Sequence, residues 1–475
     1  MKRIQIGPFN RVEGDLEISL DIDAGKVQAA RVNSPLFRGF EQVLIGRPPA
    51  DALAIVPRIC GICSVAQSAA AASALSNLAG ISLPANGQLA ARLVLAAENL
   101  ADHLTHFHLF FMPDFCHAAY VDRDWHPEIS ARFRAGIGLA VGPWLQARAR
   151  LFNLVGFLAG RWPHTLALQA GGSTKAITSG ERVRMHALLR EFRAFVETQL
   201  LGDTLEHFTT LANVDALQDW ACARESHAAL FLRAAYSLRL DQVGRATDHY
   251  LSYGAYDLFP AGSYRIGATV NPLAPEKITE DVSHAWLQNA PPLPPARGET
   301  HIDANKAGAY TWCKAPRYAG EVVETGALAR QLIANQPLLR ALTTEHGGNV
   351  IARIVARLVE VATILPAMEQ WLRDIRPGET FCLPVTLPDE GQASGLIEAA
   401  RGSLGHWLSI RRGRIERYQI IAPTTWNFSP RDRDGVPGPL ETALVGAIVR
   451  QGETTPVSVQ HIVRSFDPCM VCTVH

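Results

Sequence analysis

Cysteine is scarce in this sequence, and neither sign of charge is in excess. Eight cysteines in 475 residues are too few for a disulfide scaffold, and a chain of this length does not depend on disulfides for its stability. The 45 basic and 45 acidic side chains cancel, so the composition gives no electrostatic footprint for nucleic acid or for an anionic membrane.

Long hydrophobic runs are also missing. The N-terminus, MKRIQIGPFNRVEG, has neither an apolar core nor a small-residue cleavage site, so it is not a secretory signal. The most apolar stretch, residues 139–160, is interrupted by Gln146, Arg148 and Arg150, which favours a buried helix over a membrane span. We therefore expect a soluble, cytoplasmic chain without a membrane span, although a partner subunit could carry an export signal for both chains.

The pattern of apolar residues predicts a few strands and many helices. Residues 16–22 and 27–32 alternate and predict a hairpin near the N-terminus, and residues 407–421 predict a second hairpin. The Ala-rich residues 64–78 predict a helix that stops at Gly80. Three further long helical patterns cover residues 87–112 (ended by Pro113), 181–210 and 326–374 (interrupted near Gly347-Gly348).

Four of the eight cysteines form two Cys-x-x-Cys pairs, Cys60/Cys63 and Cys469/Cys472. Two residues between the thiols let both sulfurs reach one metal, and Gly61 lets the backbone wrap closely around it. The first pair precedes a predicted helix, whose N-terminal end stabilises thiolates. Four thiolates are soft ligands, suited to zinc, iron–sulfur or nickel centres.

A structural zinc site is the simplest interpretation of four such cysteines. Structural zinc sites usually take both pairs from neighbouring stretches, whereas these pairs are 406 positions apart (469 minus 63). A centre of this kind ties the two ends of the chain together, which favours a functional metal centre. The other cysteines are isolated, as is typical of buried apolar side chains: Cys116, Cys222, Cys313 and Cys382.

The residues around the pairs are more specific than the pairs themselves. Eight segments match one family in order: FNRVEG (9–14), FRGFEQVLIGRPPADAL (37–53), RICGIC (58–63), DHLTHF (102–107), KAPRYAGEVVETGALAR (314–330), ARGSLGHW (400–407), APTTWNFSPRD (422–432) and RSFDPCMVCTVH (464–475). Along nearly its whole length the sequence resembles the large subunit of nickel–iron hydrogenases.

The resemblance also implies the fold class. That class is mainly α with small peripheral β-sheets (α+β), arranged around a central helix bundle. The loop-rich residues 255–320, with four prolines between 291 and 295, could be a linker, but both cysteine pairs lie outside them. We therefore expect a single domain over residues 1–475, with an N-terminal hairpin (1–35), a helical core (58–375) and a C-terminal hairpin and metal-binding end (400–475).

The resemblance assigns a role to each of the four cysteines. In that family one cysteine of each pair binds nickel terminally, and the other bridges nickel to iron. Carried over, Cys60 and Cys469 are terminal ligands, whereas Cys63 and Cys472 bridge the metals. The implied cofactor is a Ni-Fe(CO)(CN)2 centre, whose iron carries carbon monoxide and cyanide.

Polar residues around that centre also match the family. Arg401 and Thr424 correspond to donors for the cyanide nitrogens, although Thr424 could be an ordinary turn residue after Pro423. Arg401, Asp102 and Asp467 correspond to a charged shell over the open side of the nickel. A buried guanidinium needs carboxylate partners, and two acidic residues would meet that need.

The same resemblance implies a route for protons. Dihydrogen splits heterolytically in that family, and a sulfur base accepts the proton. A terminal thiolate is the better base, because a bridging sulfur already shares its lone pairs with two Lewis acids, and this favours Cys469. Glu13 matches the next acceptor, which must lie within hydrogen-bond reach. Alternatively, Glu13 forms a salt bridge to Arg11 or another neighbour.

A structural magnesium ion is implied near the C-terminus. Glu41 and His475 correspond to its ligands, and the backbone carbonyl of Ile420 is a weaker correspondence. A carboxylate with retained waters suits Mg2+. The ion would hold in place the chain end that delivers Cys469 and Cys472.

Electrons that leave such a centre need a partner chain. The sequence has no ferredoxin-like run of cysteines, so iron–sulfur clusters are expected only in another subunit. The implied partner is a small iron–sulfur hydrogenase subunit, and the implied substrate is dihydrogen.

Several departures resemble the hydrogen-sensing, regulatory branch, which controls hydrogenase genes through a histidine kinase. Enzymatic members usually have histidine at the positions of Gln67 and Asp15. Ile62 and Phe110 match the bulky residues that narrow the gas channel in the sensors, although both could be ordinary core residues. We expect Phe110 on the same predicted helix as Asp102, about two turns further along and broadly on one side.

The end of the chain fits that branch too. Sensor members lack the C-terminal extension that is cleaved from other large subunits, and this sequence stops at His475, although a processed enzyme would end identically. We predict a hydrogen sensor with slow residual oxidation activity. The alternative is an energy-conserving uptake hydrogenase with high turnover.

Two interpretations from other classes are less favoured. The quinone-side subunit of respiratory complex I shares this fold without metals, but it lacks the cysteine pairs. A zinc-stapled interaction protein would be distinguished at once by metal analysis.

Overall fold

The computed structural model describes residues 2–473. The helices are α1 (Phe40–Leu44), α2 (Ala52–Ile55), α3 (Ser64–Leu78), α4 (Ala85–Thr105), α5 (His126–Phe133), α6 (Val141–Ala159), α7 (Ser179–Phe195), α8 (Leu205–Thr209), α9 (Val214–Cys222), α10 (His227–Ser237), α11 (Ala327–Ile333), α12 (Pro337–Thr344), α13 (Val350–Asp374), α14 (Pro423–Asn427), α15 (Pro439–Ala443) and α16 (Val457–Ser465). The strands are β1 (Lys2–Ile6), β2 (Glu17–Asp23), β3 (Lys26–Asn33), β4 (Leu168–Gln169), β5 (Gly172–Ser173), β6 (His249–Ser252), β7 (Gly262–Arg265), β8 (Ile278–Asp281), β9 (Ala315–Tyr318), β10 (Gly391–Ala399), β11 (Gly402–Arg411) and β12 (Arg414–Ile421).

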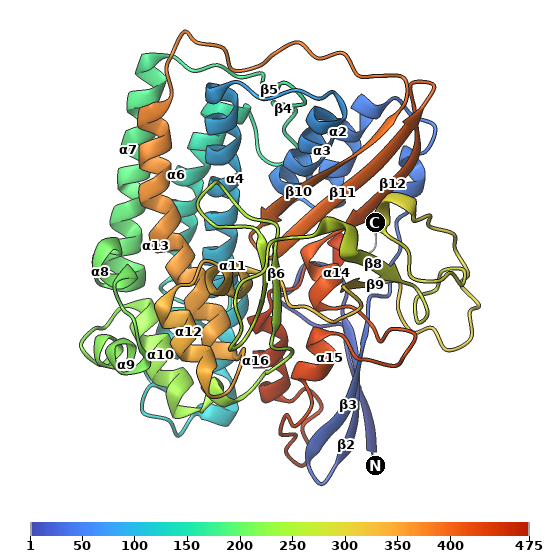
Figure 1. Ribbon diagram of the computed structural model, residues 1–475. Helices are drawn as coiled ribbons and strands as arrows, with labels where there is room; N and C mark the ends of the chain where they lie inside the picture. The colour runs from blue at the N-terminus through green and yellow to red at the C-terminus, as the bar shows by residue number, and fades with distance from the viewer. Residues whose placement is uncertain (1, 474–475) are drawn as a thin grey trace.

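The longest helices form a bundle. Helices α4, α6, α7 and α13 run side by side (Figure 1), and α13 contacts both α4 and α7. Helix α13 is capped by Asn349, whose side chain accepts a hydrogen bond from the Ala352 N–H, and most residues of the helix are buried. A helix that is apolar on nearly all sides lies inside a protein, which agrees with the burial of most of α13.

The sheets are small and lie beside the bundle (Figure 1). Two antiparallel three-stranded sheets have the orders β1-β2-β3 and β10-β11-β12, and three further sheets have two strands each. Strand β10 packs on α3, where a Cβ at Gly395 would lie 2.0 Å from the carbonyl oxygen of Ala70. Only glycine allows this close approach. The predicted fold class, mainly α with small peripheral sheets, is confirmed.

Several predicted elements agree with the structure, and others need correction. The helix over residues 64–78 and both hairpins are present. The helix predicted over residues 87–112 is not continuous, because α4 ends at Thr105 and a π-helical segment follows over His106–Phe111. The backbone turns more widely in a π-helix, so the regular spacing of an α-helix does not extend to residue 111.

The other long helical patterns are also divided. Residues 181–210 contain α7, a π-helical segment over Val196–Leu201 and α8, with a break at Gly202, whose φ of 65° is left-handed. The pattern over residues 326–374 has a second break before Pro337, in addition to the predicted one near Gly347-Gly348. Proline cannot supply the N–H that would continue the helix, and this explains the second break.

Helix α6 is amphipathic, and the prediction that residues 139–160 form a buried helix is wrong. Leu151 and Leu154 are buried, whereas Leu145 is 45% exposed. Among the described residues, no helix has the length and apolar character needed to cross a membrane.

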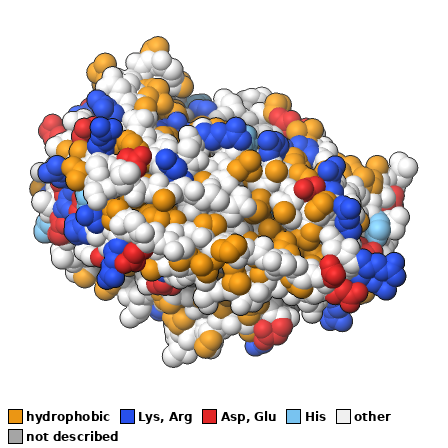
Figure 2. Space-filling view, turned by 90° about the horizontal axis from the view of Figure 1, so that it is seen from above, with side chains coloured by type: hydrophobic (Ala, Val, Ile, Leu, Met, Phe, Trp, Pro, Cys, Tyr) orange, Lys and Arg blue, Asp and Glu red, His pale blue; other side chains and the backbone are white. Residues whose placement is uncertain are grey.

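One face of the molecule is shown in Figure 2. Hydrophobic side chains cover much of its middle, and both basic and acidic side chains lie around them. This face carries no field of a single sign, as the balanced composition indicates.

Candidate metal centre

The four paired cysteines meet in the interior. Cys60 and Cys63 lie in the short segment between a 3-10 turn (Val56–Ile59) and α3, and Cys469 and Cys472 lie just after α16. Their four sulfur atoms all lie within 4.8 Å of one another, and all four residues are buried. The structure therefore joins pairs that the sequence separates by more than 400 positions.

The sulfur contacts link the two pairs member by member. Cys60 Sγ lies 3.4 Å from Cys469 Sγ, and Cys63 Sγ lies 3.2 Å from Cys472 Sγ. Within the second pair, the Cys469 and Cys472 sulfurs are 3.0 Å apart. These distances exceed the length of a disulfide bond, and all four cysteines are free thiols.

Four thiolates in one buried cluster repel one another, and the pKa values of the cysteines reflect this. Hydrogen bonds from the Cys469 and Cys472 side chains hold the pKa of Cys60 well below its usual value. Burial raises the pKa of Cys469, and the neighbouring thiols together with burial raise the pKa of Cys63. One sulfur can ionise readily, but full ionisation requires a compensating cation.

Arg401 lies beside this cluster between two carboxylates. Its Nη1 donates to Asp102, its Nη2 donates to Asp467 Oδ1 at 3.1 Å, and its Nε donates to the Asp467 carbonyl at 2.9 Å. All three residues are almost fully buried. Burial lowers the pKa of Arg401, but the charges of Asp102 and Asp467 outweigh it, and the group stays a cation. The structure therefore brings Arg401, Asp102 and Asp467 together, and their role over a metal stays a prediction.

Two other predicted residues hold the second cysteine pair through its backbone. Thr424 Oγ1 accepts a hydrogen bond from the Cys469 N–H at 3.0 Å. The carbonyl of Glu13 accepts one from the Met470 N–H at 2.7 Å. A Cβ at Gly14 would lie 2.9 Å from the Val471 nitrogen, so glycine permits this close approach.

The side chain of Glu13 is half-buried. Burial raises its pKa, and the Cys60 charge raises it further, while Arg401 and Arg38 lower it. The alternative ion pair with Arg11 does not form, because Arg11 pairs with Asp114 and donates to the Phe110 carbonyl. A carboxyl group with a raised pKa near the cysteines is suited to accept and release protons.

Arg38 was not singled out by the sequence, yet it contacts both cysteine segments. Its Nη2 donates to the carbonyl of Ile59, just before the first pair, and to the carbonyl of Val471, just before Cys472, both at 2.5 Å. The only sequence signal is its place in the matching segment at 37–53. Long-range contacts of this kind have no spacing rule in the sequence.

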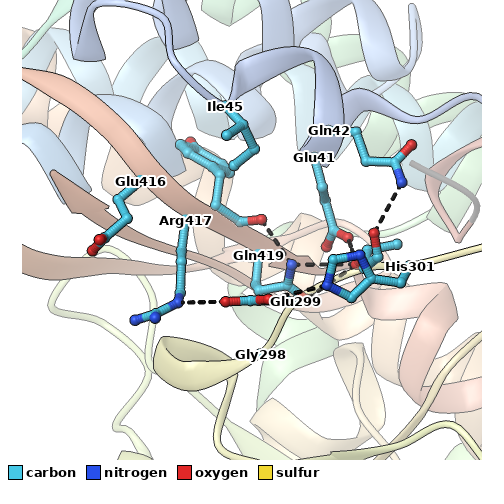
Figure 3. Close-up of a pocket in the computed structure, with 11 residues that line it drawn as sticks. Glu41, Gln42, Ile45, Gly298, Glu299, His301, Glu416, Arg417 and Gln419 are labelled. Carbon is cyan, nitrogen blue, oxygen red and sulfur yellow. Dashed lines mark hydrogen bonds and ion pairs between the residues drawn. The ribbon is translucent and has the colours of Figure 1, made fainter. Parts of the chain in front are cut away.

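Glu41 lies in the floor of a surface cavity of about 400 Å³, which Figure 3 shows. It pairs with Lys314 Nζ at 3.1 Å and accepts hydrogen bonds from the Thr300 hydroxyl and the Ile420 N–H. Ile420 thus contacts Glu41 through its N–H group. His475, the other predicted ligand, lies outside the described residues.

The two residues of the predicted gas channel are both half-buried. Ile62 packs against the core, and its N–H donates to Cys60 Sγ at 3.3 Å. Phe110 lies in the π-helical segment after α4. The predicted helix is therefore not regular from Asp102 to Phe110, and the placement of the two residues on broadly one side stays a prediction.

Gln67, the main departure from the enzymatic pattern, is buried in α3. Its Oε1 lies 2.8 Å from His406 Nε2. Its side-chain nitrogen has no hydrogen-bond partner within residues 2–473. Asp15, the second departure, is exposed.

The donor set fits a soft metal centre. Four buried sulfurs converge without a disulfide, and the cluster needs positive charge to ionise fully. Beside it, Asp102 Oδ1 and Asp467 Oδ2 have no partner among the described residues. Unpartnered buried carboxylate oxygens at a cluster of thiols are typical of a functional site.

Comparison with known proteins agrees with this geometry. The family model for nickel-dependent hydrogenases matches residues 38–126 and 143–475. The chain therefore belongs to the nickel-dependent hydrogenase family.

Individual relatives identify the subunit. The periplasmic NiFeSe hydrogenase large subunit of Desulfomicrobium baculatum is 30% identical over 100% of this chain and 95% of its own length. The uptake hydrogenase large subunit of Rubrivivax gelatinosus is 26% identical over the same shares. The solved Ni-Fe-Se hydrogenase of D. vulgaris Hildenborough in its as-isolated oxidised state matches with a TM-score of 0.86 and 30% identity, covering 100% of both chains. This protein is the large subunit of a nickel-dependent hydrogenase, and it is an enzyme.

Proposed function

We propose that this chain oxidises dihydrogen at a nickel–iron pair held by Cys60, Cys63, Cys469 and Cys472. The observation that carries the proposal is the convergence of four buried sulfurs within 4.8 Å. Cys60 and Cys469 would be terminal nickel ligands, and Cys63 and Cys472 would bridge the metals. This division follows the resemblance to the family, and all four sulfurs lie close enough to share one metal pair.

The proposed proton path uses residues of this chain. A bound nickel–iron pair would supply a redox-active Lewis acid that polarises dihydrogen. The Cys469 sulfur would accept one proton of the split dihydrogen, leaving the electron pair with the metals, and Glu13 would accept the proton next. In support, the Glu13 backbone is hydrogen-bonded beside Cys469, and burial raises the pKa of the Glu13 side chain.

Arg401 and Thr424 would hold the diatomic ligands of the iron. Arg401 has five N–H groups, and its carboxylate and carbonyl partners leave some of them free to donate to cyanide. The Thr424 oxygen accepts from Cys469 N–H, so its own hydroxyl hydrogen can still be donated. Asp102 and Asp467 would keep the guanidinium in this orientation.

Hydrogen uptake is the role that the relatives favour. Among those compared, one is named an uptake hydrogenase and another a periplasmic hydrogenase. These names support the uptake alternative better than the predicted sensor.

The hydrogen-sensing role, with a histidine kinase as partner, is the second candidate. Gln67 is the observation that favours it, since enzymatic members usually have histidine at that position. The half-buried Ile62 and Phe110 would then narrow the path of oxygen.

The proposed partner is a small iron–sulfur subunit, because the related chains are named large subunits and this sequence has no ferredoxin-like cysteine run. The cytoplasmic location stays a prediction, since one relative is named periplasmic.

Magnesium at Glu41 also stays a proposal. Thr300 and Gln419 add neutral oxygens beside the carboxylate, which suits a hard cation. Lys314 already neutralises part of the carboxylate charge, so the ion would have to share Glu41 with it.

Elemental analysis of the purified protein tests the metal assignment. We expect about one nickel and one active-site iron per chain, with no stoichiometric zinc. Cys469→Ser should lose nickel or activity, because a neutral hydroxyl is a poor substitute for a soft thiolate. As a control, Cys313→Ser changes a buried thiol outside the cluster and should retain the nickel. Stoichiometric zinc without nickel in the parent would refute the proposal.

A further inference from the structure

Glu98 is a buried carboxyl group on α4, and none of the roles above includes it. Only 2% of its surface is exposed. Its oxygens accept hydrogen bonds from the Val65 N–H and the Ala66 N–H, both at 2.9 Å, and from Trp162 Nε1 at 2.8 Å. The Ser64 hydroxyl lies 3.4 Å away.

The two backbone donors belong to the first turn of α3. The first N–H groups of a helix have no acceptor within the helix, and the residue before it usually supplies a side-chain oxygen. Here that residue is Cys63, which makes no capping hydrogen bond because its sulfur points to the other cysteines. Helix α3 therefore receives its cap from Glu98 on a different helix.

The donors around Glu98 favour its ionised form. Val65, Ala66 and Trp162 present N–H groups that can only donate, and together they contact both oxygens. Burial raises the pKa of Glu98 to about 8, even though these N–H groups oppose the shift, so the ionised form predominates only above that pH. A protonated carboxyl would turn an O–H toward donors, and the positive end of α3 also favours the anion.

We propose that Glu98 is a positioning residue of the metal centre. By capping α3 from α4 it fixes the backbone at Cys63, and in its ionised form it places a buried negative charge behind that sulfur. The inference rests on the proposed nickel–iron centre. Helix α4 would then support the centre at two positions one turn apart, Glu98 and Asp102, because Asp102 orients Arg401.

The decisive variant is Glu98→Gln. Glutamine keeps the size of the side chain but has one acceptor oxygen, and its NH2 group would face the N–H groups of Val65 or Ala66. Glu441→Gln is the matched control. Glu441 is also a buried carboxylate that accepts a backbone N–H, from Val32 at 3.0 Å, and it lies on α15.

Two measurements on the purified, metal-loaded complex, made at a pH above about 8 where Glu98 is ionised, separate its effect on the helix from the effect of its charge. In Glu98→Gln, amide hydrogen exchange at residues 64–67 should become about fivefold faster, the usual strength of a helix cap. The infrared band of carbon monoxide should shift to higher wavenumber, because losing a negative charge near the sulfurs lowers the electron density on the metals. Glu441→Gln should change neither.

Trp162→Phe provides a second test if Glu98→Gln fails to fold. It removes one donor and keeps the carboxylate and the cap. Exchange at residues 64–67 should stay unchanged, while the less neutralised anion moves the band to lower wavenumber.

Either readout at the parental value in Glu98→Gln would overturn the inference. Faster exchange with an unmoved band makes Glu98 a helix cap only, and a moved band with unchanged exchange leaves no positioning role. A parent protein without carbon monoxide bands would instead refute the proposed centre, while the exchange arm would still test the cap.

Discussion

The first and second cysteine pairs are held in place by different means. The first pair precedes α3, a regular helix, and its backbone follows from that helix and its remote cap. The second pair lies after α16 in a segment that has a single short 3-10 turn (Met470–Cys472), and hydrogen bonds to Glu13, Thr424 and Arg401 from distant parts of the chain hold it. Secondary structure thus positions one half of the centre, and tertiary contacts position the other.

The difference has a physical consequence. A helix is held by a cooperative series of backbone hydrogen bonds, so the loss of one side-chain contact costs little stability. An irregular segment has no such ladder, and each buried N–H that loses its acceptor costs the full desolvation penalty. Substitutions around the second pair should therefore have larger effects than matched substitutions around the first.

Glu13→Gln should have the largest effect on the reaction. Glutamine keeps the size and hydrogen bonding of the side chain but cannot relay a proton, so hydrogen/deuterium exchange should slow by about 10²-fold to 10⁴-fold. Metal content and infrared bands should match the parent. Glu17→Gln, on the nearby strand β2, is a control that should keep the parental rate. Parental exchange in Glu13→Gln would remove this residue from the path.

Arg401→Met should have the largest effect on stability. It leaves Asp102 and Asp467 buried and unpaired, which costs about 3–5 kcal/mol. Denaturant unfolding of the metal-free chain measures this without contributions from the metals. Arg417→Met, at a largely exposed ion pair with Glu299, is the control and should cost less than about 1 kcal/mol. If both variants lose the same free energy of unfolding, the buried ion pairs of Arg401 with Asp102 and Asp467 do not stabilise the protein more than an exposed pair.

The third prediction compares the two pairs directly. Thr424→Val removes the acceptor of the Cys469 N–H and should cost about 1–3 kcal/mol in unfolding free energy. Ser68→Ala removes a buried hydroxyl that donates to the Ser64 carbonyl in α3, and it should cost well under about 1 kcal/mol. The helix ladder already satisfies that carbonyl. If Ser68→Ala lowers the unfolding free energy as much as Thr424→Val does, the proposed difference between the two cysteine pairs is wrong.

The smallest expected change concerns gas access. The double variant Ile62→Val with Phe110→Leu removes bulk without adding polarity, so folding and metal content should stay near parental values. If these residues narrow the path, oxygen should inhibit the variant where the parent resists. Activity of parent and variant under oxygen tests this. Equal resistance would make both residues ordinary packing and would leave Gln67 as the main support for a sensor.

The sequence predicted those parts of the fold that local patterns encode. Alanines and a following Gly80 define α3, and alternation defines the hairpin of β2 and β3. Strand β10 was missed, because GQASGLIEA has little alternation and few β-branched residues. The π-helical segment after α4 was missed as well, since its composition is helical and its wider turn depends on tertiary packing.

The residues of the candidate site also divide into those that a local pattern predicts and those that it does not. Spacing alone revealed the four cysteines, whereas Arg401, Asp102 and Asp467 came only from resemblance to a family. Arg38 had no local signal. Glu98 had a weak one, a charge between alanines and a leucine on an apolar helix, because buried charges usually have specific partners. Contacts between segments hundreds of residues apart leave no periodic trace in a single sequence.

The infrared spectrum of the purified protein under hydrogen tests the central claim most directly. Metal-bound carbon monoxide and cyanide absorb where protein does not, so the spectrum reports an iron with both ligands at the four cysteines. We predict carbon monoxide and cyanide bands in the parent and their loss in Cys472→Ser, which removes a bridging ligand of the iron. A parent with stoichiometric zinc and no such bands would contradict the account.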